Sequence, residues 1–308
     1  MLSIDEILAQ GLTRSQSARY EDTGFIKPLT ALIDALNTEA DLNTAGVAFH
    51  QARLQGLLQN RKALEDWTRK HPEIAEETLL APIVIVGLPR TGTTLLHRTI
   101  ATDTGLMAPL WYEVRQPAPI DMNFVSDDGR IAIAKAEVDA MLAAMPGLAA
   151  IHPIDAIAPD EEIMLLEHSF ISTVPECYAN IPKYGEALYA QDPSASYDYL
   201  YKMLQFLQWQ KRHKGELGQR WLLKTPHHLH YPQQLFQTFP DAVVIQTHRH
   251  PSEVMPSYAS MMCELAAPFA NNLNKQTLAA HWVKKWQQGL TATQHYRDLH
   301  PDAPYFDL

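Results

Sequence analysis

Cysteine is scarce in this chain, and long hydrophobic runs are missing from it. Only Cys177 and Cys263 occur among 308 residues; they could pair, but two cysteines are too few for a disulfide-stapled secreted fold. No apolar run is long enough to cross a bilayer. The first residues, MLSIDEILAQ, have neither the basic start nor the apolar core of a signal peptide. We therefore expect a soluble cytoplasmic protein without stable membrane insertion.

Positive charge is also in short supply. The chain has 35 acidic and 25 basic side chains, which gives a formal net charge of −10. This balance argues against nucleic acid as a partner, while a local basic pocket for a small anion stays possible. Hydrophobic residues make up 46% of the chain, enough for a full core. The length suits one large domain with an appended subdomain and is compatible with a homo-oligomer.

What the sequence does contain is an alternation of helical and strand patterns. The first eighty residues show apolar side chains at helical spacing. Short β-branched or apolar runs predict strands at residues 83–86, 221–224 and 242–247, with another beginning at Tyr305. Further helices are expected at residues 93–102, 131–145, 161–170, 197–213 and 251–262. This order predicts an α/β fold with a mostly parallel sheet, a helical N-terminal subdomain (residues 1–80) and a second domain (residues 81–308).

The first strand leads into a glycine-bounded loop, Gly87 to Gly92, and then into a helix that opens with Thr93 and Thr94. Backbone N–H groups at such a helix start bind anions, and the threonine hydroxyls add donors. Thr93 stands where an ATP-binding loop has its lysine, which weakens a metal-assisted kinase as an interpretation. Arg90 supplies a charge inside the loop instead. The pattern favours metal-free transfer over an atypical kinase or an ordinary strand–turn–helix junction.

The stretch PRTGTTLL resembles the 5′-phosphosulfate loop of sulfotransferases that use 3′-phosphoadenosine-5′-phosphosulfate (PAPS). THRHPSEVMPSY is similar to the 3′-phosphate segment of that family and selects Arg249 and Ser257. LLKTPHHL is similar to its lysine–threonine segment, and EDWTRKHPEI to a bacterial branch. The resemblance implies a P-loop-like sulfotransferase fold with a helical N-terminal cap and PAPS as co-substrate without a metal. The loop residues it implies as PAPS contacts are Arg90, Thr91, Gly92, Thr93 and Thr94.

Two features depart from that family. His250 stands where the branch has aspartate, so local packing there is expected to differ. Family members also continue beyond a strand like the final Tyr305-Phe-Asp-Leu into a segment that closes over the adenosine and its 3′-phosphate. The resemblance therefore implies either a truncated chain or closure by another segment.

Sulfuryl transfer to a hydroxyl or amine needs a base for the acceptor proton and positive charge for the leaving phosphate. The resemblance implies Arg90 for the charge, with Lys224 assisting. A catalytic glutamate in the tyrosylprotein branch points to Glu113 as the base. A structural ion pair between Glu113 and Arg115 is the alternative. His227 is the second candidate, offset by one position from the base of cytosolic members.

The acceptor is expected to be small or lipid-like, and the sequence does not identify it. Four aromatic residues are candidates for an apolar acceptor pocket, although core positions are the commoner use of such residues: Trp111, Tyr112, Phe170 and Trp209. A zinc site is another alternative, because five histidines lie in two short segments: His227, His228, His230, His248 and His250. The lack of an H-E-x-x-H pattern or a cysteine pair disfavours it. A non-catalytic nucleotide-binding protein is the remaining alternative.

Overall fold

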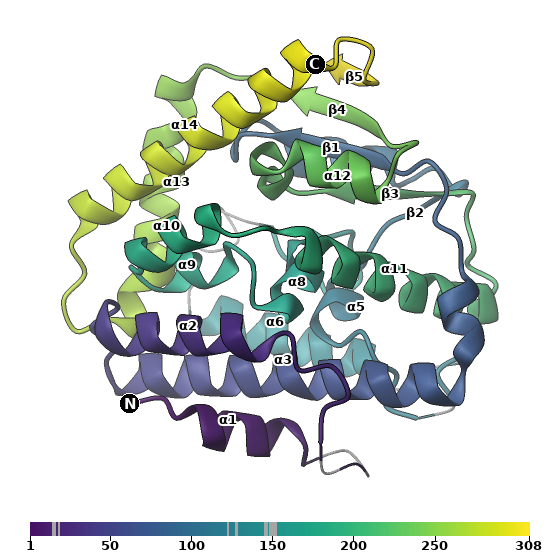
Figure 1. Ribbon diagram of the computed structural model, residues 1–308, viewed down its shortest axis with the longest axis horizontal. Coiled ribbons are helices and arrows are strands. Elements are labelled where there is room, and N and C mark those ends of the chain that lie inside the picture. Colours follow the sequence, from purple (N-terminus) through teal and green to yellow (C-terminus); the bar gives the residue numbers. More distant parts are fainter. Residues whose placement is uncertain (14–16, 18, 122, 127–128, 145–146, 148–152) are drawn as a thin grey trace.

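The protein is built on a parallel five-stranded sheet with helices around it (Figure 1). The computed structural model describes residues 1–308 except 14–16, 18, 122, 127–128, 145–146 and 148–152. In the described residues the strand order is β2-β3-β1-β4-β5. The strands are β1 (Ile83–Gly87), β2 (Leu106–Met107), β3 (Arg220–Lys224), β4 (Val243–Thr247) and β5 (Tyr305–Asp307). The predicted α/β sheet is confirmed.

The central strand β1 explains where a site can form. Val84 and Ile85 are fully buried, as expected for a strand covered on both faces. β1 pairs with β3 on one side and β4 on the other, with Ile85 opposite Lys224 and Gly87 opposite Thr247. The chain thus leaves β1 for β2 and β3 on one side and later crosses to β4 on the other. The carboxyl ends at such a switch point are the usual ligand site of open α/β sheets.

Thirteen named α-helices and four short 3-10 helices (η) lie in the described residues. The α-helices are α1 (Ile4–Gly11), α2 (Ile26–Thr38), α3 (Thr44–Lys70), α4 (Thr93–Ile100), α5 (Trp111–Arg115), α6 (Arg130–Ala144), α8 (Ile163–Leu166), α9 (Val174–Tyr178), α10 (Pro182–Ala190), α11 (Ser194–Lys214), α12 (Pro232–Thr238), α13 (Pro251–Ala266) and α14 (Lys275–Leu299). The 3-10 helices are η1 (Pro72–Glu76), η2 (Glu167–Ser169), η3 (Pro226–His230) and η4 (Ala267–Phe269).

The predicted elements are present within a few residues of their expected bounds, except for one helix, and several elements were not predicted. The helix expected over residues 161–170 is reduced to α8 followed by η2, and Phe170 ends it in a left-handed conformation with φ 59°. The sequence analysis predicted no element at the positions of β2, α5, α9, α10, α12 and α14, of which α14 is the longest, with 25 residues. The helix expected over 131–145 appears as α6, while Met145 lies outside the described residues.

The N-terminal helices α1 to α3 form a layer on the far side of the molecule from the sheet, with α8 to α11 between them (Figure 1). Their buried side chains, among them Leu29 and Leu58, share one hydrophobic cluster with Phe170, Ile181 and Leu188 from the middle of the chain. The layer therefore packs on the rest of the fold. The division at residue 80 stays a prediction.

Both cysteines are free: Cys177 is half-buried and Cys263 is buried. Within the described part of the chain, none of the helices is both long enough and apolar enough to span a membrane.

Candidate functional site

The loop after β1 is held against the end of β4 by a close backbone approach. Gly87 has φ 145°, and a Cβ at this position would lie 2.3 Å from Thr247 Oγ1 and 2.8 Å from the Thr247 carbonyl oxygen. Thr91 Oγ1 donates to the Leu88 carbonyl at 2.7 Å and lies 2.6 Å from Thr247 Oγ1. Thr91 therefore ties the loop to β4, a role that leaves its hydroxyl little freedom to reach a ligand.

Gly92 turns the loop into α4 with φ 90°, and no side chain caps the N–H groups at the start of this helix. Arg90 has φ 72°, a strained conformation for a residue with a side chain. Such strain is common where a backbone is shaped for ligand binding. The loop geometry supports an anion site at the amino end of α4.

Arg90, Arg249 and Ser257, which the sequence analysis assigned to two motifs, meet in one cluster. Arg90 Nε donates to Ser257 Oγ at 3.2 Å. Arg249 Nη1 donates to the Arg90 carbonyl at 3.5 Å, and Arg249 Nε donates to Glu253 one turn away at 2.8 Å. The Arg249 and Glu253 side chains are more than half exposed, so their ion pair is weak and open to exchange with an anion.

A cavity of about 720 Å³ joins this cluster to an apolar wall. Seven of the ten candidate site residues line it: Arg90, Gly92, Thr93, Thr94, His227, Arg249 and Ser257. The apolar part of the lining comes mainly from α8, α9, α13 and α14, and includes Ile163, Met164, Val174, Tyr178, Tyr258, Met261, Met262, Leu265 and Trp286. An anion-binding end and an apolar end thus share one space.

Glu161 also lines the cavity, and its partner Lys224 is not among the lining residues. Lys224 Nζ donates to Glu161 Oε1 at 2.5 Å and to Thr94 Oγ1 at 3.4 Å. The Lys224 side chain is buried, whereas that of Glu161 is 20% exposed and lines the cavity. A carboxylate open to the cavity beside the phosphate loop is the position that a proton acceptor needs. The sequence analysis missed Glu161, whose only local signal is the acidic run Asp160-Glu-Glu.

The neighbouring carboxylate, Glu162, is fully buried and binds the end of β3. Its Oε2 accepts the backbone N–H of Lys224 at 2.7 Å, and its Oε1 lies 2.9 Å from His228 Nε2. His228 Nδ1 is in turn 2.7 Å from the hydroxyl of Tyr197. Burial opposes the charge of Glu162, but the hydrogen bond and charge of His228 outweigh it and lower the pKa of the carboxyl. Glu162 therefore stays ionised and holds the end of β3.

His227 lines the cavity but is almost fully buried. Its Nδ1 lies 3.4 Å from Thr173 Oγ1, and its Nε2 has no hydrogen-bond partner among the described residues. Burial, with the nearby charges of His228 and Lys285, lowers the pKa of His227 well below the usual histidine value. His227 is thus a neutral imidazole at physiological pH and a weak proton acceptor.

Glu113, the first candidate base from the sequence, lies outside the cavity. It is 3% exposed, its Oε1 accepts from Lys211 Nζ at 2.8 Å, and its Oε2 accepts the backbone N–H of Leu110 at 2.9 Å. It is not among the residues that line the cavity. The alternative expectation, a pair with Arg115, is wrong in its partner, because Arg115 pairs with Glu137. The structure thus gives Glu113 the contacts of a buried structural carboxylate.

The aromatic residues expected at an acceptor pocket separate into two groups. Trp111 lines the cavity. The other three pack into hydrophobic clusters outside it and are corrected to core residues: Tyr112, Phe170 and Trp209. The other aromatic residues of the lining are Tyr178, Tyr258 and Trp286, which come from three separate helices.

The rings of His228 and His230 each lie 6.4 Å from that of His227, but the five histidines have separate partners. His228 contacts Glu162, His248 contacts Asp307, and His230 stacks on Trp286 with 5.1 Å between ring centroids. Among the described residues, no three histidine, cysteine, aspartate or glutamate side chains gather as metal ligands.

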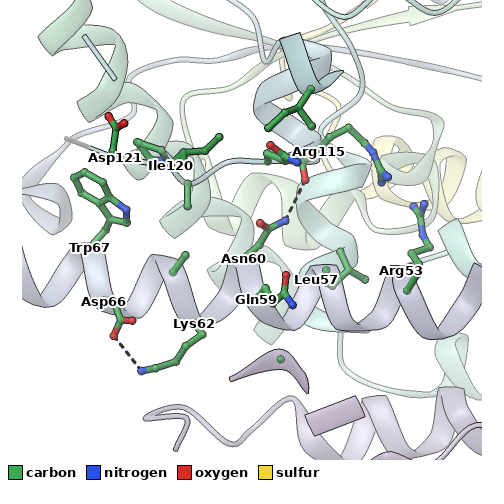
Figure 2. A pocket seen from close by; sticks show the side chains of 18 of the residues that line it. Arg53, Leu57, Gln59, Asn60, Lys62, Asp66, Trp67, Arg115, Ile120 and Asp121 are labelled. Carbon is green, nitrogen blue, oxygen red and sulfur yellow. Dashed lines mark hydrogen bonds and ion pairs between the residues drawn. The ribbon is translucent and has the colours of Figure 1, made fainter. Parts of the chain in front are cut away.

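A second hollow, of about 680 Å³, runs along α3 (Figure 2). Arg53, Asn60, Lys62 and Trp67 of α3 form one side of it, and Arg115 with the segment up to Asp121 forms the other. None of the ten candidate site residues lines it. This groove is therefore separate from the phosphate loop.

Comparison with known proteins agrees with this geometry. Residues 82–308 match the model of the sulfotransferase family. The chain belongs to the sulfotransferase family. This segment contains the sheet, the phosphate loop and the cavity described above. None of the curated proteins compared with the chain matches it significantly.

Two solved structures resemble the whole chain. Sulfotransferase STF1 from Mycobacterium tuberculosis H37Rv is 26% identical with a TM-score of 0.88, and the match covers all of this chain and 84% of that one. Sulfotransferase STF9 from Mycobacterium avium is 21% identical with the same TM-score, and the match covers all of this chain and 79% of that one. Both comparisons include the N-terminal helical layer, and they confirm the sulfotransferase fold.

The Gly87 geometry gives the first prediction. Gly87→Ala places a methyl group against Thr247 and forces alanine into a left-handed conformation, which should lower the free energy of unfolding by about 1–3 kcal/mol. Gly56→Ala is the matched control, because a Cβ there meets nothing within 4 Å and α3 favours alanine. Urea unfolding measures both. Equal stability of the two variants would contradict the close-approach argument.

Proposed function

We propose that this sulfotransferase moves a sulfuryl group from PAPS to a hydroxyl or amine of a small or lipid-like acceptor. The observation that carries the proposal is the single cavity that has an anion cradle at one end and a mainly apolar wall at the other. A doubly phosphorylated nucleotide suits the first end, and an uncharged acceptor body suits the second. Family membership supports sulfuryl transfer, and the two ends of the cavity support the choice of donor and acceptor.

In this proposal the donor lies across the ends of β1 and β4. Arg249 and Ser257 bind its 3′-phosphate, with Arg249 exchanging Glu253 for the nucleotide. The N–H groups and hydroxyls of residues 92–94 hold the 5′ end, where Arg90 and Lys224 supply positive charge. Charge-assisted hydrogen bonds of this kind suit phosphate oxygens, and they stabilise the charge that develops when the S–O bond to the phosphate breaks.

Glu161 is the carboxylate we assign as proton acceptor. The acceptor oxygen or nitrogen forms a new bond to sulfur, its proton passes to Glu161, and 3′-phosphoadenosine-5′-phosphate (PAP) leaves with the electrons of the broken S–O bond. Exposure to the cavity and the contact with Lys224, itself near Thr94, support this choice. Glu113 remains the sequence-based candidate, and His227 is the third; their surroundings favour Glu161.

The donor proposal predicts transfer without a divalent metal. Radioactive sulfur from ³⁵S-labelled PAPS should appear on an apolar alcohol such as 2-naphthol in the presence of EDTA, because arginine and lysine supply the charge that Mg²⁺ supplies in kinases. The control replaces PAPS by ³²P-labelled ATP with Mg²⁺. Phosphate transfer from ATP, with no sulfuryl transfer, would favour the kinase interpretation.

The base assignment predicts different outcomes for two carboxylates. Glu161→Gln should lower kcat by roughly 10²–10⁴-fold with little change in PAP affinity, because only proton transfer is lost. Glu113→Gln should lower the melting temperature, since it weakens a buried pair with Lys211, and should leave the kcat of the folded enzyme nearly unchanged. If the large loss of kcat followed Glu113→Gln instead, Glu113 would be the base.

A further inference from the structure

The segment between Glu161 and Tyr178 carries one wall of the cavity, and a side chain from the N-terminal layer holds it. That side chain is Arg53 of α3. Its Nε donates to Glu167 Oε1 at 2.6 Å and its Nη2 to Glu167 Oε2 at 2.5 Å. The Arg53 side chain is 8% exposed and that of Glu167 is 2% exposed, so this is a buried, two-pronged pair.

The same guanidinium touches the wall of the cavity from behind. Its Nη2 lies 3.9 Å from the sulfur of Met164, and its central carbon lies 5.1 Å from the centre of the Tyr178 ring. Met164 and Tyr178 both line the cavity, whereas Arg53 does not. Arg53 faces the groove along α3 instead, where its side chain rises from the helix (Figure 2). Arg53 therefore lines the groove and also contacts two residues of the cavity wall.

The contacts of Arg53 bear on the carboxylate assigned as base. Glu167 follows directly after α8, and α8 follows directly after Glu161 and Glu162. Glu162 anchors the start of this segment to the end of β3. Arg53 anchors its other end, six residues beyond Glu161. A segment of a single helical turn has little stability of its own, so its position depends on contacts such as these two anchors, together with the bond of Lys224 to Glu161 and that of Arg61 to the His168 carbonyl.

We propose that Arg53 is a positioning residue of the reaction. From the N-terminal helical layer, it fixes the position of the acceptor wall and of the Glu161 carboxylate. This inference rests on the proposed function for its kinetic consequence. The planar guanidinium is needed because it binds both Glu167 oxygens and packs on Met164 and Tyr178 at the same time. Lysine keeps the positive charge, but it cannot donate two parallel hydrogen bonds to a carboxylate and has no planar group to pack on a ring.

The kinetic test compares Arg53→Lys with Arg130→Lys, using PAPS and 2-naphthol as the probe acceptor. Arg130 is a matched control, because it is 1% exposed and donates to Gln116, Pro117 and Gln210, none of which lines the cavity. Arg53→Lys should raise the KM for 2-naphthol on the order of tenfold and leave the Kd of PAP unchanged. A merely structural role would lower the melting temperature in both variants without changing KM, and that result would overturn the proposal.

A second readout needs no activity. Cys177 lines the cavity next to Tyr178, and burial raises the pKa of its thiol to about 12, so alkylation by iodoacetamide should be slow in the native protein. Mass spectrometry of the peptide containing Cys177 should show faster alkylation in Arg53→Lys and an unchanged rate in Arg130→Lys. Equal rates in the two variants would overturn the positioning role.

The two readouts separate failure of this inference from failure of the proposed function. If the native protein bound no PAP and transferred no sulfuryl group, the proposed function would be wrong, and the alkylation rates would still decide the role of Arg53. The double variant Arg53→Met/Glu167→Met covers the case in which Arg53→Lys folds poorly, because it leaves no buried charge unpaired. Faster Cys177 alkylation in the double variant supports the proposal, and a native rate contradicts it.

Discussion

The close approach of Gly87 to Thr247 is the constraint on which the site depends. Only glycine lets the end of β1 lie this near the end of β4, and the Thr91 hydroxyl then holds the loop to the Thr247 side chain. With the loop fixed there, Arg90 reaches Ser257 and its carbonyl accepts from Arg249. Two motifs separated by about 160 residues thereby meet in one cluster.

The same secondary-structure elements carry residues at both ends of the cavity. Helix α13 carries Ser257 at the anion end and then Tyr258, Met261 and Leu265 along the apolar wall. A nucleotide that orders the start of α13 would therefore also order part of the acceptor wall. The opposite wall depends on the segment after Glu161, which is held at β3 by Glu162 and at α3 by Glu167. In this account the N-terminal helices are part of the site.

Local patterns in the sequence predicted much of this, because they need only neighbouring residues. The strand, the glycine loop and the threonine-led helix follow one another in the chain, and Arg249 lies two residues before the helix that carries Ser257. Contacts between distant segments gave no such signal. Glu161 meets Lys224 across 63 residues, and Glu113 meets Lys211 across 98. The aromatic residue type likewise did not show which ring would face the cavity. Helix α14 was missed because its buried stripe includes Gly289 and Thr293 among apolar residues.

The central claim is that the ends of β1 and β4 bind one nucleotide with phosphates at both its 3′ and 5′ positions. Titration calorimetry of the native protein and Arg249→Ala, with PAP and with adenosine 5′-phosphosulfate, tests it most directly. The account predicts that PAP binds without metal and loses about tenfold or more in affinity in Arg249→Ala. It also predicts that adenosine 5′-phosphosulfate, which lacks the 3′-phosphate, binds both proteins equally. An equal loss for both nucleotides, or no binding of PAP, would contradict the account.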